Sequence, residues 1–214
     1  MRAILMFQLL LVSSIALSSF ANALMVDFED IPHEPVNGVG DVISGGFLFD
    51  PLTDHYHVLD HTYLGGPANG TTWLAIDDNL GNNPMTMSTI DGSAFSLFSV
   101  DIAEWFAEPS TNIQVTGVYS GGGSVSTNVI LDQVWDGVGG VADFETIIFG
   151  AGWSSLSSVV FDSIGAGNGP HQGWAIDNIN TSAVPAPPSL LIFATGIIGL
   201  ALGSLGSDRF HAKH

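Results

Sequence analysis

The 214-residue sequence contains no cysteine, which excludes disulfides, thiolate metal sites and cysteine nucleophiles. Positive charge is nearly absent as well, because the three Lys and Arg residues are Arg2, Arg209 and Lys213. Residues 24–183 therefore contain 20 carboxylates (21 less Asp208) and no permanent cation. Since affinity for nucleic acids comes mainly from Lys and Arg, this composition excludes nucleic-acid binding by residues 24–183 and disfavours anionic lipid surfaces.

Common catalytic signatures are also missing from the sequence. It has no Gly-x-Ser-x-Gly, no His-Glu-x-x-His, no phosphate-binding Gly-Lys-Ser/Thr and no EF-hand loop. Glu104 and Glu108 are the nearest approach to paired carboxylates, and we interpret them as solvated residues at a strand end. We therefore expect a protein that is not an enzyme, with a polysaccharide-active enzyme as an alternative.

The two ends of the chain are apolar. Residues 1–23 have a positive start at Arg2, an apolar core and the small-x-small triplet Ala21-Asn22-Ala23, which together predict a cleavable signal peptide. Residues 190–207 form an apolar run at the lower length limit for a transmembrane helix. The two cations in residues 208–214 favour a cytoplasmic end for this tail.

A proline-rich sequence lies directly before that apolar run. Val184, Pro185, Ala186 and Pro187, within residues 184–189, precede a glycine-containing helix and a short basic tail, and this order resembles the PEP-CTERM sorting signal of exported bacterial proteins. Ala186 stands where Glu is usual, and the tail lacks an Arg cluster. The resemblance implies signal peptidase and an exosortase as export partners and an inner-membrane-tethered precursor. It also implies a mature form at the cell surface or in the biofilm matrix; a plain membrane anchor is the alternative.

Between the ends, residues 24–183 predict one all-β domain. Short alternating apolar and polar runs are separated by Gly, Pro, Asn and Asp, which favours an antiparallel β-sandwich of the jelly-roll type. The connection of residues 120–123, Ser-Gly-Gly-Gly, suits a hairpin. The predicted strands cover residues 25–30, 42–49, 72–77, 94–102, 112–119, 124–132, 144–149, 156–164 and 174–180.

The first and last predicted strands suggest a cation site. Residues 26–30 and 173–179 resemble the framing strands of MAM-type and related jelly rolls, which implies an adhesion or carbohydrate-binding module. A strand places Asp27 and Glu29 on one face, and Asp177 and Asn178 lie on the last strand. With no Lys or Arg to neutralise these oxygens, they predict a structural Ca²⁺ site. Separately solvated carboxylates are the alternative.

A histidine-rich segment is the most unusual local pattern. In an extended chain His55 and His57 share a face and have a spacing suited to Zn²⁺ or Cu²⁺, although two nitrogens fall short of a firm site. A solvent-facing loop is the simpler interpretation. The same histidines with Tyr56, Tyr63 and Trp73 could instead line a sugar-binding surface. We thus predict a non-enzymatic binding module for exopolysaccharide, with a purely structural matrix or surface protein as the alternative.

Overall fold

The computed structural model of the protein describes residues 23–32, 34–52, 56–60, 62–63, 66–78, 84–105, 112–132, 134, 143–164 and 172–182. All of them belong to the compact unit Met1–Val184. The predicted signal peptide up to residue 22, the sorting motif of residues 184–187 and the predicted transmembrane segment lie outside the described residues. In the described part of the chain, no helix has the length and apolarity needed to cross a membrane.

The described residues form thirteen strands. In chain order they are β1 (Ala23–Val26), β2 (Glu34–Gly38), β3 (Val42–Ser44), β4 (Phe47–Pro51), β5 (Tyr56–Leu59), β6 (Trp73–Asp78), β7 (Met85–Thr89), β8 (Leu97–Trp105), β9 (Asn112–Tyr119), β10 (Ser124–Ile130), β11 (Glu145–Ile148), β12 (Leu156–Ser163) and β13 (Gln172–Ser182).

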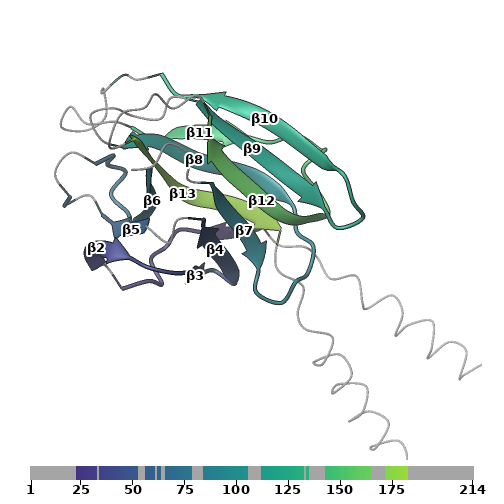
Figure 1. The fold of residues 1–214 in the computed structure, drawn as a ribbon, viewed down its shortest axis with the longest axis horizontal. Helices are drawn as coiled ribbons and strands as arrows, with labels where there is room; N and C mark the ends of the chain where they lie inside the picture. The colour runs from purple at the N-terminus through teal and green to yellow at the C-terminus, as the bar shows by residue number, and fades with distance from the viewer. Residues whose placement is uncertain are drawn as a thin grey trace, which may run out of the picture. The chain divides into compact units, whose positions relative to one another are not determined.

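The strands pair into two sheets that lie face to face (Figure 1). One sheet has the order β11-β8-β13-β6-β5-β2, with β1 added to β13, and the other has the order β10-β9-β12-β7-β4-β3. Every pairing is antiparallel. The predicted antiparallel β-sandwich is therefore confirmed.

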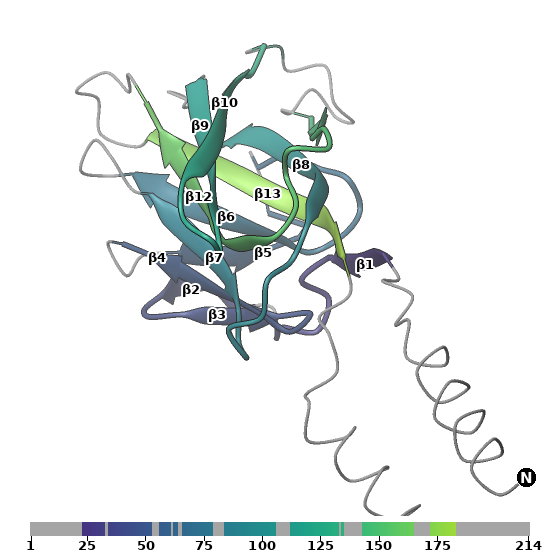
Figure 2. The same ribbon diagram turned by 90° about the vertical axis from the view of Figure 1, so that its right-hand side faces the viewer.

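The core lies between the sheets because alternate residues of each strand point inward. Leu156, Val159 and Phe161 of β12 are buried in this core. Phe47 and Phe49 of β4 are buried in it as well. Figure 2 shows the two layers edge-on and β1 beside the end of β13. That pairing, with Val26 opposite Ile179, brings the first and last strands together.

The strand predictions succeed where alternation is regular and fail where a turn interrupts a run. Residues 112–119 form β9 as predicted, and the following glycines close the hairpin to β10 with positive φ at Gly122 and Gly123. The predicted strand 42–49 is instead the hairpin β3–β4. Gly45 and Gly46 have φ of 55° and 82°, the conformation of a two-residue hairpin turn. Strands β2, β5 and β7 were not predicted.

Candidate functional site

Three carboxylates meet between the ends of the two sheets. Glu104 lies on β8, Glu145 begins β11, and Asp132 follows β10 in the opposite sheet. Their carboxylate oxygens lie within 4.8 Å of one another, and they form the one such acidic or histidine group among the described residues. We call these residues the carboxylate triad. This arrangement can bind a metal ion.

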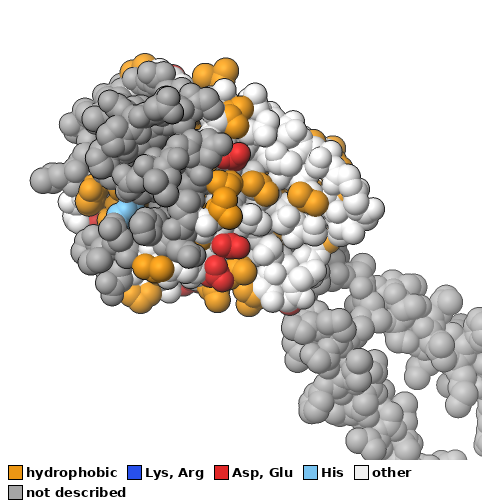
Figure 3. Space-filling model, viewed as in Figure 1, with side chains coloured by type: hydrophobic (Ala, Val, Ile, Leu, Met, Phe, Trp, Pro, Cys, Tyr) orange, Lys and Arg blue, Asp and Glu red, His pale blue; other side chains and the backbone are white. Residues whose placement is uncertain are grey.

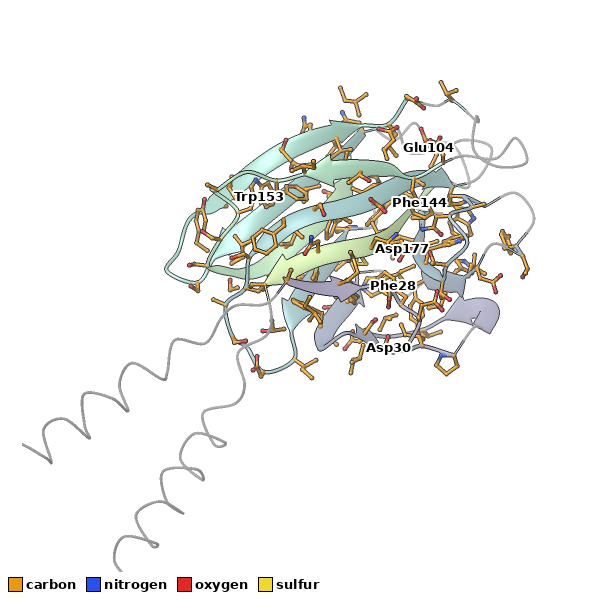
Figure 4. The ribbon with its side chains drawn as sticks, turned by 180° about the vertical axis from the view of Figure 1, so that it is seen from behind. Phe28, Asp30, Glu104, Phe144, Trp153 and Asp177 are labelled. Carbon is orange, nitrogen blue, oxygen red and sulfur yellow. The ribbon has the colours of Figure 1, made fainter. Side chains whose placement is uncertain are left out.

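Glu104 is buried because it continues the inward-facing alternation of β8. Val100 and Ile102 point into the core, and Glu104 pairs with the core residue Trp174 of β13. Its exposed fraction is 1%, so the prediction of a solvated strand end is wrong for Glu104 (Figure 4). The triad was not predicted from the sequence, although the period of two that places Val100 and Ile102 inward predicts the same for Glu104.

Backbone donors hold the other two members in place. The Asp132 amide donates a hydrogen bond to Glu145 Oε1 at 2.9 Å, and the Val134 amide donates to Asp132 Oδ1 at 2.7 Å. Asp132 is exposed and Glu145 is half-buried, so the triad is open to solvent on one side. Since residues 24–183 contain no Lys or Arg, no permanent cation within them neutralises the triad.

The predicted Ca²⁺ ligands come to one region, where β1, β13 and the start of β6 meet. The prediction that Asp27 and Glu29 share a strand face is wrong, because β1 ends at Val26 and Phe28 has a φ of +57° in the turn that follows. Asp27 Oδ1 accepts a hydrogen bond from the Glu29 amide at 3.3 Å, and Glu29 Oε1 accepts one from the Thr72 amide at 2.7 Å.

Asp177 is fully buried and hydrogen-bonded within this region. Its Oδ2 accepts from Asn69 Nδ2 at 2.6 Å and lies 2.7 Å from Thr71 Oγ1, while its Oδ1 accepts from the Asn178 amide at 2.7 Å. Burial raises the pKa of Asp177 to about 6 against the lowering effect of these hydrogen bonds, and the charge of Asp101 adds to the rise. Asp177 thus ties residues 69–71 to the last strand.

Asn178 joins Asp177 to the neighbouring strand. It has a φ of +46° and lies in a bulge of β13, a left-handed conformation that Asn tolerates better than most residues. Its Nδ2 donates to Asp101 Oδ2 at 3.0 Å, and Thr146 Oγ1 donates to Asp101 Oδ1 at 2.6 Å. The predicted ligands Asp177 and Asn178 therefore take part in a hydrogen-bond network across β11, β8 and β13.

The predicted sugar-contacting residues separate onto two faces of a sheet. Tyr56 packs against the core between the sheets. His57, Tyr63 and Trp73 lie on the outer face around Trp105, with ring centroids 4.7, 6.3 and 6.1 Å from that of Trp105. We call these four residues the outer aromatic cluster. His55 lies outside the described residues.

A row of alanines makes room for the outer aromatic cluster. Ala75, Ala175 and Ala103 are buried and lie opposite one another on β6, β13 and β8. Trp73 and Trp105 are buried on this outer face, whereas Tyr63 is 37% exposed and His57 is half-buried. Trp73 therefore serves as core, and Tyr63 presents the cluster to solvent.

No protein-family model and no curated protein matches the chain. Among solved structures, it is similar to the K2 cleaved adhesin domain of Lys-gingipain, at 14% identity and a TM-score of 0.42 over 74% of this chain and 97% of that chain. TmCBM61 in complex with β-1,4-galactotriose has 9% identity and a TM-score of 0.37 over 72% and 97%.

A further similar chain belongs to a larger protein. An exo-β-agarase has 13% identity and a TM-score of 0.43 over 76% of this chain and 25% of that chain. This chain therefore spans about a quarter of the agarase's length. The assignment of the β-sandwich rests on the strand pairing described above.

Proposed function

We propose that the protein is an exported, non-enzymatic module that binds extracellular polysaccharide and holds Ca²⁺ at the carboxylate triad. The observation that carries the calcium part of this proposal is the meeting of Glu104, Asp132 and Glu145 from the two sheets in a domain without Lys or Arg. The signal-like residues 1–23 and the PEP-CTERM-like residues 184–214 support export, processing by an exosortase and a place at the cell surface or in the matrix.

Ca²⁺ suits the triad because every candidate ligand atom in it is an oxygen. A bound ion offsets the repulsion of three carboxylates and joins β8 and β11 of one sheet to the chain after β10 of the other. Exposed Asp132 gives the ion access from solvent. The ion's role in this proposal is to clasp the sandwich rather than to take part in a reaction.

The charge of the domain restricts the polysaccharide. With 20 carboxylates and no Lys or Arg in residues 24–183, direct contact with an anionic glycan is repulsive, so the ligand is a neutral glycan or an acidic one bridged by Ca²⁺. Tyr63 offers an exposed ring for stacking on a pyranose. Its ring contacts that of Trp105, which also contacts His57.

Calcium binding is tested by thermal unfolding of the full chain, purified in detergent, in Ca²⁺ and in EDTA. At a Ca²⁺ concentration 100 times Kd, binding adds about 2.7 kcal/mol to the free energy of unfolding, which raises Tm by about 5–10 °C. We expect Glu104→Gln to abolish this rise and Glu29→Gln to keep it. If Glu29→Gln abolishes the rise in Tm and Glu104→Gln keeps it, the ion binds at the predicted site between β1 and β13. If Ca²⁺ does not raise the Tm of the unsubstituted protein, calcium binding at either site is contradicted.

Glycan binding is tested by affinity electrophoresis of the full chain through native gels that contain the host's exopolysaccharide. We expect retardation in Ca²⁺ relative to gels without polysaccharide, less retardation in EDTA, and less for Tyr63→Ala. Mobility that does not change with the polysaccharide contradicts glycan binding and favours a purely structural matrix protein. Retardation that persists in EDTA shows that glycan binding does not depend on a bound ion.

A further inference from the structure

Strand β10 is an edge strand, at the border of its sheet, and among the described residues it lacks the usual protection against pairing with another strand. Proteins block such borders with short strands, charged residues or proline. Among the other described border strands, β1 has four residues, β3 has three, β11 has four and begins with Glu145, and β2 contains Pro35. β10 has seven residues, Ser-Val-Ser-Thr-Asn-Val-Ile, with neither charge nor proline, and it runs along the border of its sheet (Figure 1).

The backbone of β10 has hydrogen-bonding groups directed away from the protein. The Tyr119 amide donates to the Gly123 carbonyl at 3.0 Å, and Val118 lies opposite Ser124 in the same register. In an antiparallel ladder, bonds to one neighbour recur at every second residue. Val125, Thr127 and Val129 therefore bond to β9. The amides and carbonyls of the alternate residues (Ser124, Ser126, Asn128 and Ile130) point away from β9, to the side where no described strand pairs with β10.

Pairing of this border with itself does not place carboxylates opposite one another. In an antiparallel pair centred on Thr127, Ser124 lies opposite Ile130 of the second copy and Ser126 lies opposite Asn128. The nearest carboxylate, Asp132, then lies opposite Gly122. Although the chain has a net charge of −18, this register places no carboxylate opposite another. The sheet face around it is also poor in acidic side chains (Figure 3).

We propose that β10 pairs antiparallel with β10 of a second copy of this chain, with Thr127 at the two-fold axis. The outward-facing residues then form four hydrogen-bonded pairs, with about eight backbone hydrogen bonds, and the two sheets become one continuous sheet. Val125, which is half-exposed at the border, is covered by Val129 of the second copy. The interface is isologous and closed, so it produces dimers rather than fibres.

The absence of cysteine makes this register directly testable. Thr127→Cys introduces the sole thiol of the full chain. Non-hydrogen-bonded partners have Cα atoms about 4.5 Å apart, within the range of about 4.4–6.8 Å that a disulfide spans. Oxidation of membranes from a host that exports the full chain should give a dimer band on a non-reducing gel.

Two further variants separate this register from chance collision. Ser124→Cys lies on the same border, but its own counterpart is six positions away, about 20 Å, so we expect little cross-linking. Adding Ser126→Lys to Thr127→Cys places a charge on the exposed face of the border and should reduce cross-linking about tenfold. Equal cross-linking of Thr127→Cys and Ser124→Cys, no cross-linking of Thr127→Cys, or no effect of Ser126→Lys each overturns the proposal.

Discussion

Replacement of Trp73 by alanine should lower the free energy of unfolding by about 3–5 kcal/mol, the loss typical of a buried aromatic residue. Trp73 has no exposed surface and packs with Leu59, Trp105 and Ala175 on the outer face of its sheet. A Cβ atom at Gly66 would lie 2.7 Å from its ring, so the segment before β6 packs closely over it. Denaturant unfolding of the full chain measures the change.

Tyr63→Ala is the matched control for this prediction. Tyr63 belongs to the same cluster but is 37% exposed, so its loss should cost less than about 1 kcal/mol. The two variants therefore assign different roles within the outer aromatic cluster, a structural role to Trp73 and a surface role to Tyr63. Equal losses for both, or a Trp73→Ala protein as stable as the unsubstituted one, would show that the cluster is not a second core.

The fold could be predicted from the sequence because period-two alternation is a local signal. It identified residues 112–119 as a strand to the residue, and short runs with glycine-rich turns were enough to predict a β-sandwich. The signal failed at β5, where Val58 and Leu59 are both buried. The core covers one face of that strand and the outer aromatic cluster the other, so no alternation is visible.

The candidate site was harder to predict because it depends on contacts between distant segments. The first and last strands meet, but the left-handed Phe28 turns the chain before Glu29, so Asp27 and Glu29 do not share a strand face as predicted. The triad joins Glu104 of β8 and Glu145 of β11 in one sheet to Asp132, which follows β10 of the other. A burial pattern identifies Glu104 as inward-facing, yet only the pairing of β11 with β8 shows that Glu145 lies near it.

Burial favours the neutral form of Asp177, and the hydrogen-bond partners around it can accommodate one proton on the carboxyl. Thr71 Oγ1 lies 2.7 Å from Asp177 Oδ2 and 2.6 Å from Asn69 Oδ1, but a hydroxyl has one proton and can donate to one of them. A proton on Asp177 resolves this conflict. The carboxyl then donates to Thr71, Thr71 donates to Asn69 Oδ1, and Asn69 Nδ2 donates back to Asp177 Oδ2 at 2.6 Å.

Loss of the proton from Asp177 should make the protein less stable as pH rises. Its pKa rises from 3.8 to about 6 on folding, so the folded state binds the proton more tightly than the unfolded chain. The contribution of Asp177 is complete below about pH 3.8 and is lost as pH rises through about 6, a decrease of about 3 kcal/mol. Urea unfolding in EDTA between pH 3.5 and 7.5 should show this decrease in the difference between the unsubstituted protein and Asp177→Asn.

Asp177→Asn isolates the contribution of Asp177 ionisation to the free energy of unfolding, because the amide stays neutral at every pH. It leaves Asn69 Nδ2 facing another amide donor, which costs stability, but that cost does not vary with pH. Asp91→Asn is the control of opposite sign, since hydrogen bonds from Ser93 lower the pKa of Asp91, whose contribution is lost as pH falls. Parallel stability curves for the unsubstituted protein and Asp177→Asn contradict the neutral carboxyl. If the decrease occurs in EDTA but disappears in Ca²⁺, the ion stabilises the ionised form of Asp177, and the predicted site at β1 and β13 binds calcium.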